Sequence, residues 1–235
     1  MKGENTAIVL AAGQGKRMNS SVQKQFLEIG GKPLIYYSLK CFQESSLIRD
    51  IILVTGEEFV PYCKKEIVNK YGFTKIKRVI AGGKERYDSV YQGLLACEDS
   101  EYVLIHDGAR PFITQEILER GMEGVKETGA CVIGMPSKDT VKISDEDGFV
   151  QETPDRNTVW TVQTPQIFSY PLIRAAHDKI RQGNMSGITD DAMAVEQESG
   201  ARIRLVKGSY MNIKITTPED LDVAEKFLKN IQNYS

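Results

Sequence analysis

The sequence contains no long run of apolar residues, and this excludes several classes of protein. None of its apolar stretches approaches the roughly 20 residues that a membrane-spanning helix requires. The run Ala7–Ala12 near the start is short and leads into a glycine loop, whereas a secretory signal needs a longer apolar region and a cleavage site. We therefore expect a soluble, cytoplasmic protein.

Cysteine is scarce as well, with 4 residues in a chain of 235 and no CxxC pair among them. Each cysteine lies in an apolar or amphipathic stretch far from the others, which is typical of reduced residues in or near a core. The sequence therefore predicts no zinc site. The four positions are Cys41, Cys63, Cys97 and Cys131.

The chain also lacks an excess of charge of either sign. Its 30 basic and 32 acidic residues give a formal net charge of −2, so we expect no broad field for binding nucleic acid or a membrane surface. A cationic site must then be a local cluster, which suits a small phosphorylated ligand better than a polymer. With 41% apolar and 26% charged residues, the composition fits an ordinary globular protein with one large domain, or one domain with an appendage.

Short apolar runs alternate with amphipathic segments along the first 135 residues. This order predicts right-handed crossovers and an α/β fold, a Rossmann-like, mainly parallel sheet with helices on both faces. Ligands bind such sheets outside the carboxyl ends of the strands, which indicates the loops after Leu10, Ala81, His106 and Met135. The predicted strands are Thr6–Leu10, Asp50–Thr55, Lys77–Ala81, Tyr102–His106 and Cys131–Met135, and the predicted helices are Leu34–Gln43, Glu57–Tyr71, Arg86–Cys97 and Gln115–Glu127.

The alternation stops between Pro136 and about Thr161. Two strand-like stretches, 139–143 and 148–152, flank an acidic turn there and predict a β-hairpin with few core residues of its own. A two-stranded hairpin is marginal alone, so we expect this arm, residues 137–161, to pack against something else, such as a second subunit. Beyond it the pattern predicts helices at Tyr170–Gln182 and Asp190–Glu198, a strand at Arg202–Val206 and a closing helix at Pro218–Asn230.

A glycine loop, AAGQGKRM over residues 11–18, follows the first predicted strand. Its glycines let the backbone approach a ligand and point amide groups at phosphate oxygens, while Arg17 and the nearby Lys24 supply positive charge. A tight strand-to-helix turn would explain the glycines alone equally well. Two other motifs do not fit, because a P-loop needs GxxxxGK and the dinucleotide fingerprint needs a third glycine where Met18 stands.

The pattern GxGxRM, with Lys24-Gln25-Phe26 close behind, resembles the amino-terminal motif of nucleotidyltransferases that act on sugar phosphates and related alcohols. Ala12 in place of a second glycine makes it most similar to the 2-C-methyl-D-erythritol 4-phosphate cytidylyltransferase family of the non-mevalonate isoprenoid pathway. Gly108 departs from the alanine more frequent in that family but keeps the backbone free to approach a ligand. The resemblance continues through almost the whole chain, in Gly82–Arg86, Asp88–Val90, His106–Pro111, Asp139–Lys142, Asp155-Arg156, Gln163–Gln166, Thr189–Ala192 and Asn212–Lys214.

The resemblance implies a single nucleotidyltransferase domain over residues 1–235, a homodimer formed through the arm, and Mg²⁺ or another divalent cation as cofactor. It implies that Arg17 and Lys24 stabilise charge on the α-phosphate of CTP, and that Arg156 and Lys214 position the acceptor phosphate, Arg156 in the partner's active site. The residues it assigns to the nucleotide are Ala11, Ala12, Gly13, Gly15, Gly83, Lys84, Ser89, Asp107 and Gly108. Those it assigns to the polyol phosphate are Asp107, Arg110, Thr140, Arg156, Thr164, Thr189 and Lys214.

Several of these residues allow more than one interpretation. A lone aspartate after an apolar strand often caps the next turn, but the magnesium of a triphosphate needs a carboxylate, so we take Asp107 as a metal or substrate contact. Arg110 either faces a ligand phosphate or pairs with a neighbouring carboxylate. Ser89 either contacts the cytosine base or caps a helix. His106 is expected to be a packing residue at the strand end.

The expected reaction is an in-line attack of the acceptor phosphate on the α-phosphorus of CTP. A phosphomonoester has a second pKa of about 6 and is largely dianionic at pH 7, so no general base is required. Catalysis should come from charge neutralisation and alignment.

Three other functions are compatible with parts of the pattern. A ribitol- or ribulose-phosphate cytidylyltransferase shares the scaffold and the chemistry, but such relatives tend to have a glycine where this chain has Ala12. A non-catalytic nucleotide sensor would not need both sides of a transfer site. A nicotinamide dehydrogenase is disfavoured by the broken dinucleotide fingerprint.

Overall fold

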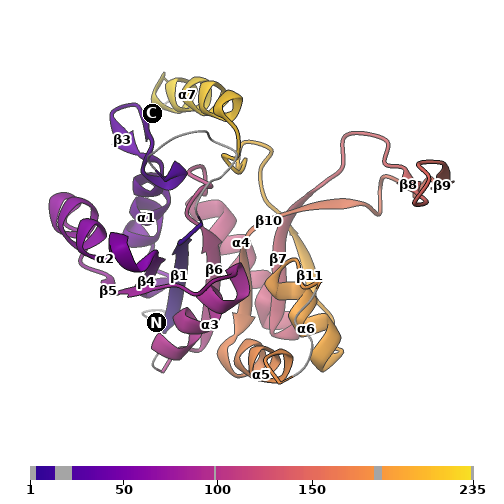
Figure 1. Cartoon of the computed structure of the whole chain (residues 1–235), viewed down its shortest axis with the longest axis horizontal. Coiled ribbons are helices and arrows are strands. Elements are labelled where there is room, and N and C mark those ends of the chain that lie inside the picture. The colour runs from indigo at the N-terminus through magenta and orange to yellow at the C-terminus, as the bar shows by residue number, and fades with distance from the viewer. Residues whose placement is uncertain (1–3, 14–22, 98, 183–186, 234–235) are drawn as a thin grey trace.

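The computed structural model describes residues 4–13, 23–97, 99–182 and 187–233. Its centre is a seven-stranded sheet (Figure 1). The strands are β1 (Asn5–Ala11), β4 (Ile48–Thr55), β5 (Ile76–Ala81), β6 (Tyr102–Asp107), β7 (Ala130–Pro136), β10 (Trp160–Ser169) and β11 (Arg204–Lys207). They lie side by side in the order β11-β7-β10-β6-β1-β4-β5.

The sheet is mainly parallel, as the alternation of strands and helices predicts. Only β10 runs antiparallel to its neighbours β6 and β7. The sequence pattern does not predict this strand, because Pro165 interrupts a stretch rich in polar residues and proline cannot donate to a ladder. The pairing of β10 with β7 is irregular between Val162 and Gln166, and the Thr164–Pro165 peptide bond is cis.

Helices cover both faces of the sheet (Figure 1). One face packs against α1 (Leu34–Glu44), α4 (Gln115–Thr128) and the π-helical segment η4 (Cys63–Asn69), and the other packs against α3 (Arg86–Ala96), α5 (Tyr170–Ile180) and α6 (Asp191–Ser199). Side chains of a strand alternate between the faces: Ala7 and Val9 join the first core and Ile8 joins the second. The predicted helix Glu57–Tyr71 is a succession of η3 (Glu57–Phe59), α2 (Val60–Tyr62) and η4.

Helix α4 illustrates how the local sequence sets these elements. The Thr114 side chain accepts a hydrogen bond from the backbone of Ile117 at its start, and Gly129 ends the helix in the left-handed conformation with φ 75°. Its buried face consists of Ile117, Leu118, Gly121, Met122 and Val125, which recur at the spacing of one helical face.

The closing helix α7 (Pro218–Asn233) packs on a small hairpin formed by β2 (Glu28–Ile29) and β3 (Lys32–Pro33). Leu228 and Ala224 of α7 form a third core with Ile29 and with Ile215, which lies in the segment that leads from β11 to the helix. This core holds the backbone on the carboxyl side of Lys214, a residue that the sequence assigns to substrate binding.

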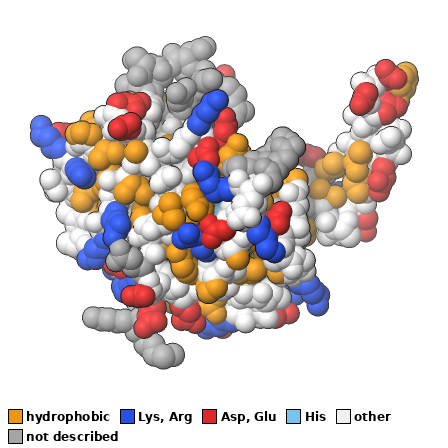
Figure 2. All heavy atoms as spheres, turned by 60° about the horizontal axis from the view of Figure 1, so that its bottom comes forward, with side chains coloured by type: hydrophobic (Ala, Val, Ile, Leu, Met, Phe, Trp, Pro, Cys, Tyr) orange, Lys and Arg blue, Asp and Glu red, His pale blue; other side chains and the backbone are white. Residues whose placement is uncertain are grey.

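The predicted arm is a hairpin that projects from the body, with β8 (Ile143–Ser144) paired to β9 (Val150–Glu152) near its tip (Figure 1). The hairpin is confirmed, although its paired strands are shorter than the sequence predicts. Phe149 is 72% exposed and Val150 61%, with Ile143 at 44%. Figure 2 shows the arm standing apart from the body, with hydrophobic and acidic side chains on the face in view.

The four cysteines are free thiols buried in the core, as expected. Burial raises the pKa of Cys41, Cys97 and Cys131 to about 12 and that of Cys63 to about 11. In the part of the chain that the structure describes, no helix combines the length and the apolar character needed to cross a membrane.

Candidate active site

A cavity of about 720 Å³ lies at the carboxyl ends of β1, β4, β5 and β6. Three of the loops that the sequence indicates contribute to it, those after β1, β5 and β6. The loop after β4 adds Gly56, Glu57 and Glu58, which the sequence analysis does not single out, and the loop after β7 leads into the arm instead. The remaining lining residues are Leu10, Ala12, Gly13, Gln23, Lys24, Gln25, Gly82, Gly83, Lys84, Glu85, Arg86, Ser89, Asp107, Ala109 and Lys214.

The first wall is the glycine loop, of which Ala12 and Gly13 line the cavity and Ala11 is buried at the end of β1. The side chain of Gln25 ties this wall to a later segment, because its Nε2 donates to the carbonyl oxygens of Ala11 and, at 3.4 Å, of Gly13. Gln25 is only 2% exposed. Gly15 and Arg17, both predicted to act here, lie outside the described residues.

Lys24 lines the cavity from the short 3-10 turn η2 (Lys24–Phe26). The two residues that follow Lys24 hold the turn in place. Gln25 binds the glycine loop, and the buried ring of Phe26 packs 5.6 Å from that of Phe59 and 5.0 Å from that of Tyr62. Lys24 therefore extends from an anchored backbone.

The second wall is the loop between β5 and α3. The Ser89 hydroxyl accepts a hydrogen bond from the Gly83 backbone at 3.1 Å and donates to the Glu85 carbonyl at 3.2 Å. A Cβ at Gly82 would lie 2.6 Å from Ser89 Oγ and 2.8 Å from the Cβ of Ala12, so glycine is required where the two walls meet. Ser89 thus organises the start of α3 and also lines the cavity, as does the exposed Lys84.

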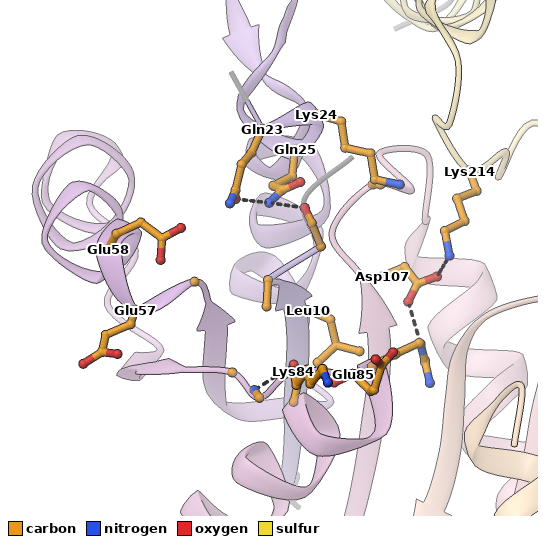
Figure 3. A pocket seen from close by; sticks show the side chains of 18 residues that line it. Leu10, Gln23, Lys24, Gln25, Glu57, Glu58, Lys84, Glu85, Asp107 and Lys214 are labelled. Carbon is orange, nitrogen blue, oxygen red and sulfur yellow. Dashed lines mark hydrogen bonds and ion pairs between the residues drawn. The ribbon is translucent and has the colours of Figure 1, made fainter. Parts of the chain in front are cut away.

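Asp107, the last residue of β6, is the buried charge of the cavity, with 8% exposure. Its Oδ1 accepts a hydrogen bond from Arg86 Nε at 3.3 Å, and its Oδ2 pairs with Lys214 Nζ at 2.7 Å (Figure 3). Burial alone would raise the pKa of Asp107, but the charges of Arg86 and Lys214 outweigh it and hold this pKa well below its usual range. Asp107 is therefore ionised at neutral pH.

Gly108 follows Asp107 where β6 meets β1. Its backbone N–H donates to the Leu10 carbonyl at 2.8 Å, and a Cβ at this position would lie 2.9 Å from the same oxygen. The small residue permits this close approach and brings Ala109 to the cavity wall.

Lys214 reaches the cavity from the segment that connects β11 to α7, and Arg110 holds that segment in place. Arg110 Nη1 donates to the Asn212 carbonyl at 2.8 Å and Nη2 donates to the Val162 carbonyl at 3.3 Å. The Ile215 backbone N–H donates to the Ala109 carbonyl at 2.9 Å. Arg110 thus binds backbone oxygens in this structure, which neither of the interpretations from the sequence describes.

Thr164 and His106 are buried beneath the cavity. The Thr164 hydroxyl accepts a hydrogen bond from the Asp107 backbone at 3.1 Å and lies 3.1 Å from His106 Nδ1. The His106 ring packs edge-on against that of Phe42 at 5.3 Å, and burial lowers the pKa of His106 to about 4. His106 is the packing residue that the sequence predicts, and Thr164 supports the end of β6.

Three further residues assigned to the polyol phosphate lie away from the cavity. Thr140 and Arg156 are exposed on the arm, and Thr189 is exposed just before α6. The structure thus brings together Lys24, Asp107 and Lys214 but not these three.

The residues that sequence reasoning missed are Gln23, Gln25, Glu57, Glu58, Glu85 and, above all, Arg86. Arg86 and Glu85 stand inside a motif block, but 21 positions separate Arg86 from Asp107 and no spacing rule connects them. Gln25 lies beside Lys24 in the KQF motif, which is the only signal that could have indicated it.

Comparison with known proteins gives the family of the chain. The sequence profile of 2-C-methyl-D-erythritol 4-phosphate cytidylyltransferase matches residues 5–230. The enzyme of that name from Lachnoclostridium phytofermentans is 53% identical over 229 residues, which cover 97% of this chain and 98% of the relative. The one from Lachnospira eligens is 50% identical over 226 residues, which cover 96% of this chain and 99% of the relative. The crystal structure of the 4-diphosphocytidyl-2C-methyl-D-erythritol synthase from Anaerococcus prevotii superposes with a TM-score of 0.86 at 35% identity, covering 97% of each chain. The chain therefore belongs to the 2-C-methyl-D-erythritol 4-phosphate cytidylyltransferase family.

Proposed function

We infer that the chain transfers CMP from CTP to 2-C-methyl-D-erythritol 4-phosphate, giving 4-diphosphocytidyl-2-C-methyl-D-erythritol and pyrophosphate. Beyond family membership, the observation that supports this function is the convergence of Lys24, Asp107 and Lys214 on one cavity from distant parts of the sequence. A volume of about 720 Å³ lies within the usual range for small-molecule sites.

The reaction requires two anionic phosphates to meet. An oxygen of the acceptor phosphate forms a new bond to the α-phosphorus of CTP, while the bond from that phosphorus to the bridging oxygen breaks and pyrophosphate leaves. Because the acceptor is already largely dianionic at neutral pH, the site needs no general base. Neither histidine of the chain, His106 or His177, lines the cavity, and burial lowers the pKa of His106, which agrees with a reaction driven by charge and alignment.

We propose that the two lysines act on different phosphates. Figure 3 shows Lys24 and Lys214 on two different segments at the cavity, with Asp107 next to Lys214. We assign Lys24, together with Arg17, to the α-phosphate and its bridging oxygen, and Lys214 to the acceptor phosphate. In this assignment Asp107 directs Lys214 before the substrates bind, because the two groups are paired at 2.7 Å.

The nucleoside is assigned to the walls formed by the two glycine loops. Ala12 lies against Gly82, where a Cβ would come within 2.8 Å of the Ala12 Cβ, and Gly83 and Ser89 line the cavity beside this contact. Backbone amides and a hydroxyl suit cytosine, which offers oxygen and nitrogen acceptors and one amino donor. Ala11, Gly13 and Gly108 would shape the same wall.

The charges of the cavity suit a divalent cation. The described lining has four basic side chains, Lys24, Lys84, Arg86 and Lys214, and four acidic ones, Glu57, Glu58, Glu85 and Asp107, so it does not by itself neutralise a triphosphate. Mg²⁺ is usually held by one or two carboxylates together with substrate phosphates, and the ionised Asp107 fits that requirement. Asp107 would hold the cation, which when bound would neutralise charge on the triphosphate.

We propose that the enzyme is a homodimer formed through the arm. The exposed Phe149, Val150 and Ile143 need a surface to cover them. Thr140 and Arg156 lie on the arm, away from the cavity of their own chain, so a role in positioning the acceptor would have to be exercised in the partner's cavity.

A side-by-side turnover assay tests the function. Pyrophosphate release is measured with CTP and, in turn, 2-C-methyl-D-erythritol 4-phosphate, ribitol 5-phosphate and ribulose 5-phosphate. We expect the methylerythritol substrate to be strongly preferred. Equal or better turnover with a pentitol or pentulose phosphate would reject the assigned acceptor, and no release with any of the three would favour a nucleotide sensor.

A further inference from the structure

A chain of paired charges runs from the cavity wall into the body of the protein. Arg86, which lines the cavity, binds two carboxylates at once: its Nε donates to Asp107 Oδ1 at 3.3 Å and its Nη1 donates to Asp191 Oδ2 at 2.8 Å. Asp107 faces the cavity. Asp191 is 1% exposed and is not among the residues that line it. The guanidinium is therefore held between one carboxylate that can meet a ligand and one that cannot.

Asp191 is fixed by the fold and not by any ligand. It is the first residue of α6, and its backbone N–H donates to Gln166 Oε1 of β10 at 3.1 Å, as does that of Ala192 at 3.0 Å. Its second carboxylate oxygen faces the buried His177, with Oδ1 3.5 Å from Nε2. Neither Gln166 nor His177 is among the residues that line the cavity.

The position of Arg86 depends on this second carboxylate. A guanidinium can give two parallel hydrogen bonds to a single carboxylate, and such a bidentate pair is stronger than one bond. In the structure Arg86 gives Nε to Asp107 and Nη1, on a different edge of the guanidinium, to Asp191, so the two carboxylates attract the group in different directions. Without the charge of Asp191 the guanidinium would be drawn onto Asp107 and would occupy both of its oxygens, one of which now faces Lys214.

We propose that Asp191 is a positioning residue for the transfer reaction, which holds Arg86 against the cavity wall from outside and so keeps Asp107 available to Lys214 and to the metal-bound nucleotide. The proposal rests on the function assigned to the cavity. It gives a role to a buried carboxylate that does not touch a substrate.

The test compares Asp191→Asn with Asp190→Asn. Asp190 is an adjacent aspartate at the same helix start, where its Oδ1 accepts a hydrogen bond from Met193 N and its Oδ2 one from Gln166 Nε2, both at 2.8 Å, with no bond to Arg86. Calorimetric CTP binding with Mg²⁺ and no acceptor is measured beside turnover per folded enzyme. We expect Asp191→Asn to weaken CTP binding and lower kcat/KM roughly ten- to hundredfold, and Asp190→Asn to stay within about threefold of the wild type.

A double-mutant cycle with Arg86→Met separates positioning from a merely structural role. Because Asp191 acts through Arg86, adding Asp191→Asn to Arg86→Met should change kcat/KM by less than about threefold. The same loss in both backgrounds, or equal CTP affinities for Asp191→Asn and Asp190→Asn, would overturn the proposal. Wild-type turnover tests the function of the cavity separately, so the two failures are distinguishable.

A second variant keeps the idea testable if Asp191→Asn does not fold. Arg86→Lys retains the charge but not the planar fork that reaches two carboxylates in fixed geometry. We expect it to reduce CTP affinity as Asp191→Asn does, and unchanged affinity in Arg86→Lys would also overturn the proposal.

Discussion

Replacing Lys214 by methionine removes the positive charge that lies 2.7 Å from Asp107 while keeping most of the side-chain volume. The cost to folding should be small. The Lys214 side chain is 37% exposed, and Asp107 keeps its bond to Arg86, so we expect a loss of at most about 1 kcal/mol in the free energy of unfolding. The flanking Ile213 and Ile215 still pack in the third core and hold the segment in place.

The cost to the reaction should be much larger. A fixed cation that meets the acceptor phosphate acts where charge is concentrated, and the loss of one such group raises a barrier by about 3–4 kcal/mol, or roughly 10²- to 10³-fold in rate. The measurement is pyrophosphate release at saturating CTP over a range of acceptor concentrations, beside urea unfolding. Lys40→Met is the matched control, because Lys40 lies on the surface of α1, where it pairs with Glu44 at 3.8 Å.

The comparison of the two effects decides the role of Lys214. A variant with near-normal stability and a loss of at least a hundredfold in kcat/KM supports direct action on the acceptor. A loss of less than about threefold, similar to that of Lys40→Met, would refute the assignment.

Three other substitutions test separate parts of the structure. Asp107→Asn should lower the free energy of unfolding at pH 7 by about 2–3 kcal/mol. Because the pKa of Asp107 is lowered in the folded state, the stability that its charge contributes is complete above about pH 4 and is lost as the pH falls further. The urea midpoints of variant and wild type should therefore converge in acid, and a constant difference would contradict this. Gly82→Ala puts a Cβ 2.6 Å from Ser89 Oγ and should weaken CTP binding about tenfold in calorimetry, with unchanged affinity as the contrary result. Phe149→Ser, at an arm side chain 72% exposed, should shift the enzyme from dimer to monomer in sedimentation equilibrium, and an unchanged mass would argue against an interface at the arm.

The fold could be predicted from the sequence wherever burial leaves a continuous apolar run or a clear helical period. The strands around Ile8, Leu53 and Leu104 are of this kind, since both of their faces are covered. β10 is not, because Pro165 and its polar neighbours break the pattern while tertiary contacts with β6 and β7 still enforce the strand.

The candidate site likewise has residues that the sequence predicts and residues that only the tertiary structure brings in. Ala12 and Gly83 follow strands, and Asp107 ends one, whose carboxyl ends share one edge of the sheet, so their convergence follows from the topology. Lys214 arrives through a segment held by Arg110 and by α7, and only the family resemblance pointed to it. The contact of Arg86 with Asp191 spans 105 positions and depends entirely on how α3 and α6 pack against the same face of the sheet.

The most direct test of the central claim is a crystal structure with 4-diphosphocytidyl-2-C-methyl-D-erythritol bound. We expect the diphosphate to contact both Lys24 and Lys214, with cytosine beside Gly83 and Ser89. A product bound outside this cavity, with Lys214 still paired only to Asp107, would contradict the account.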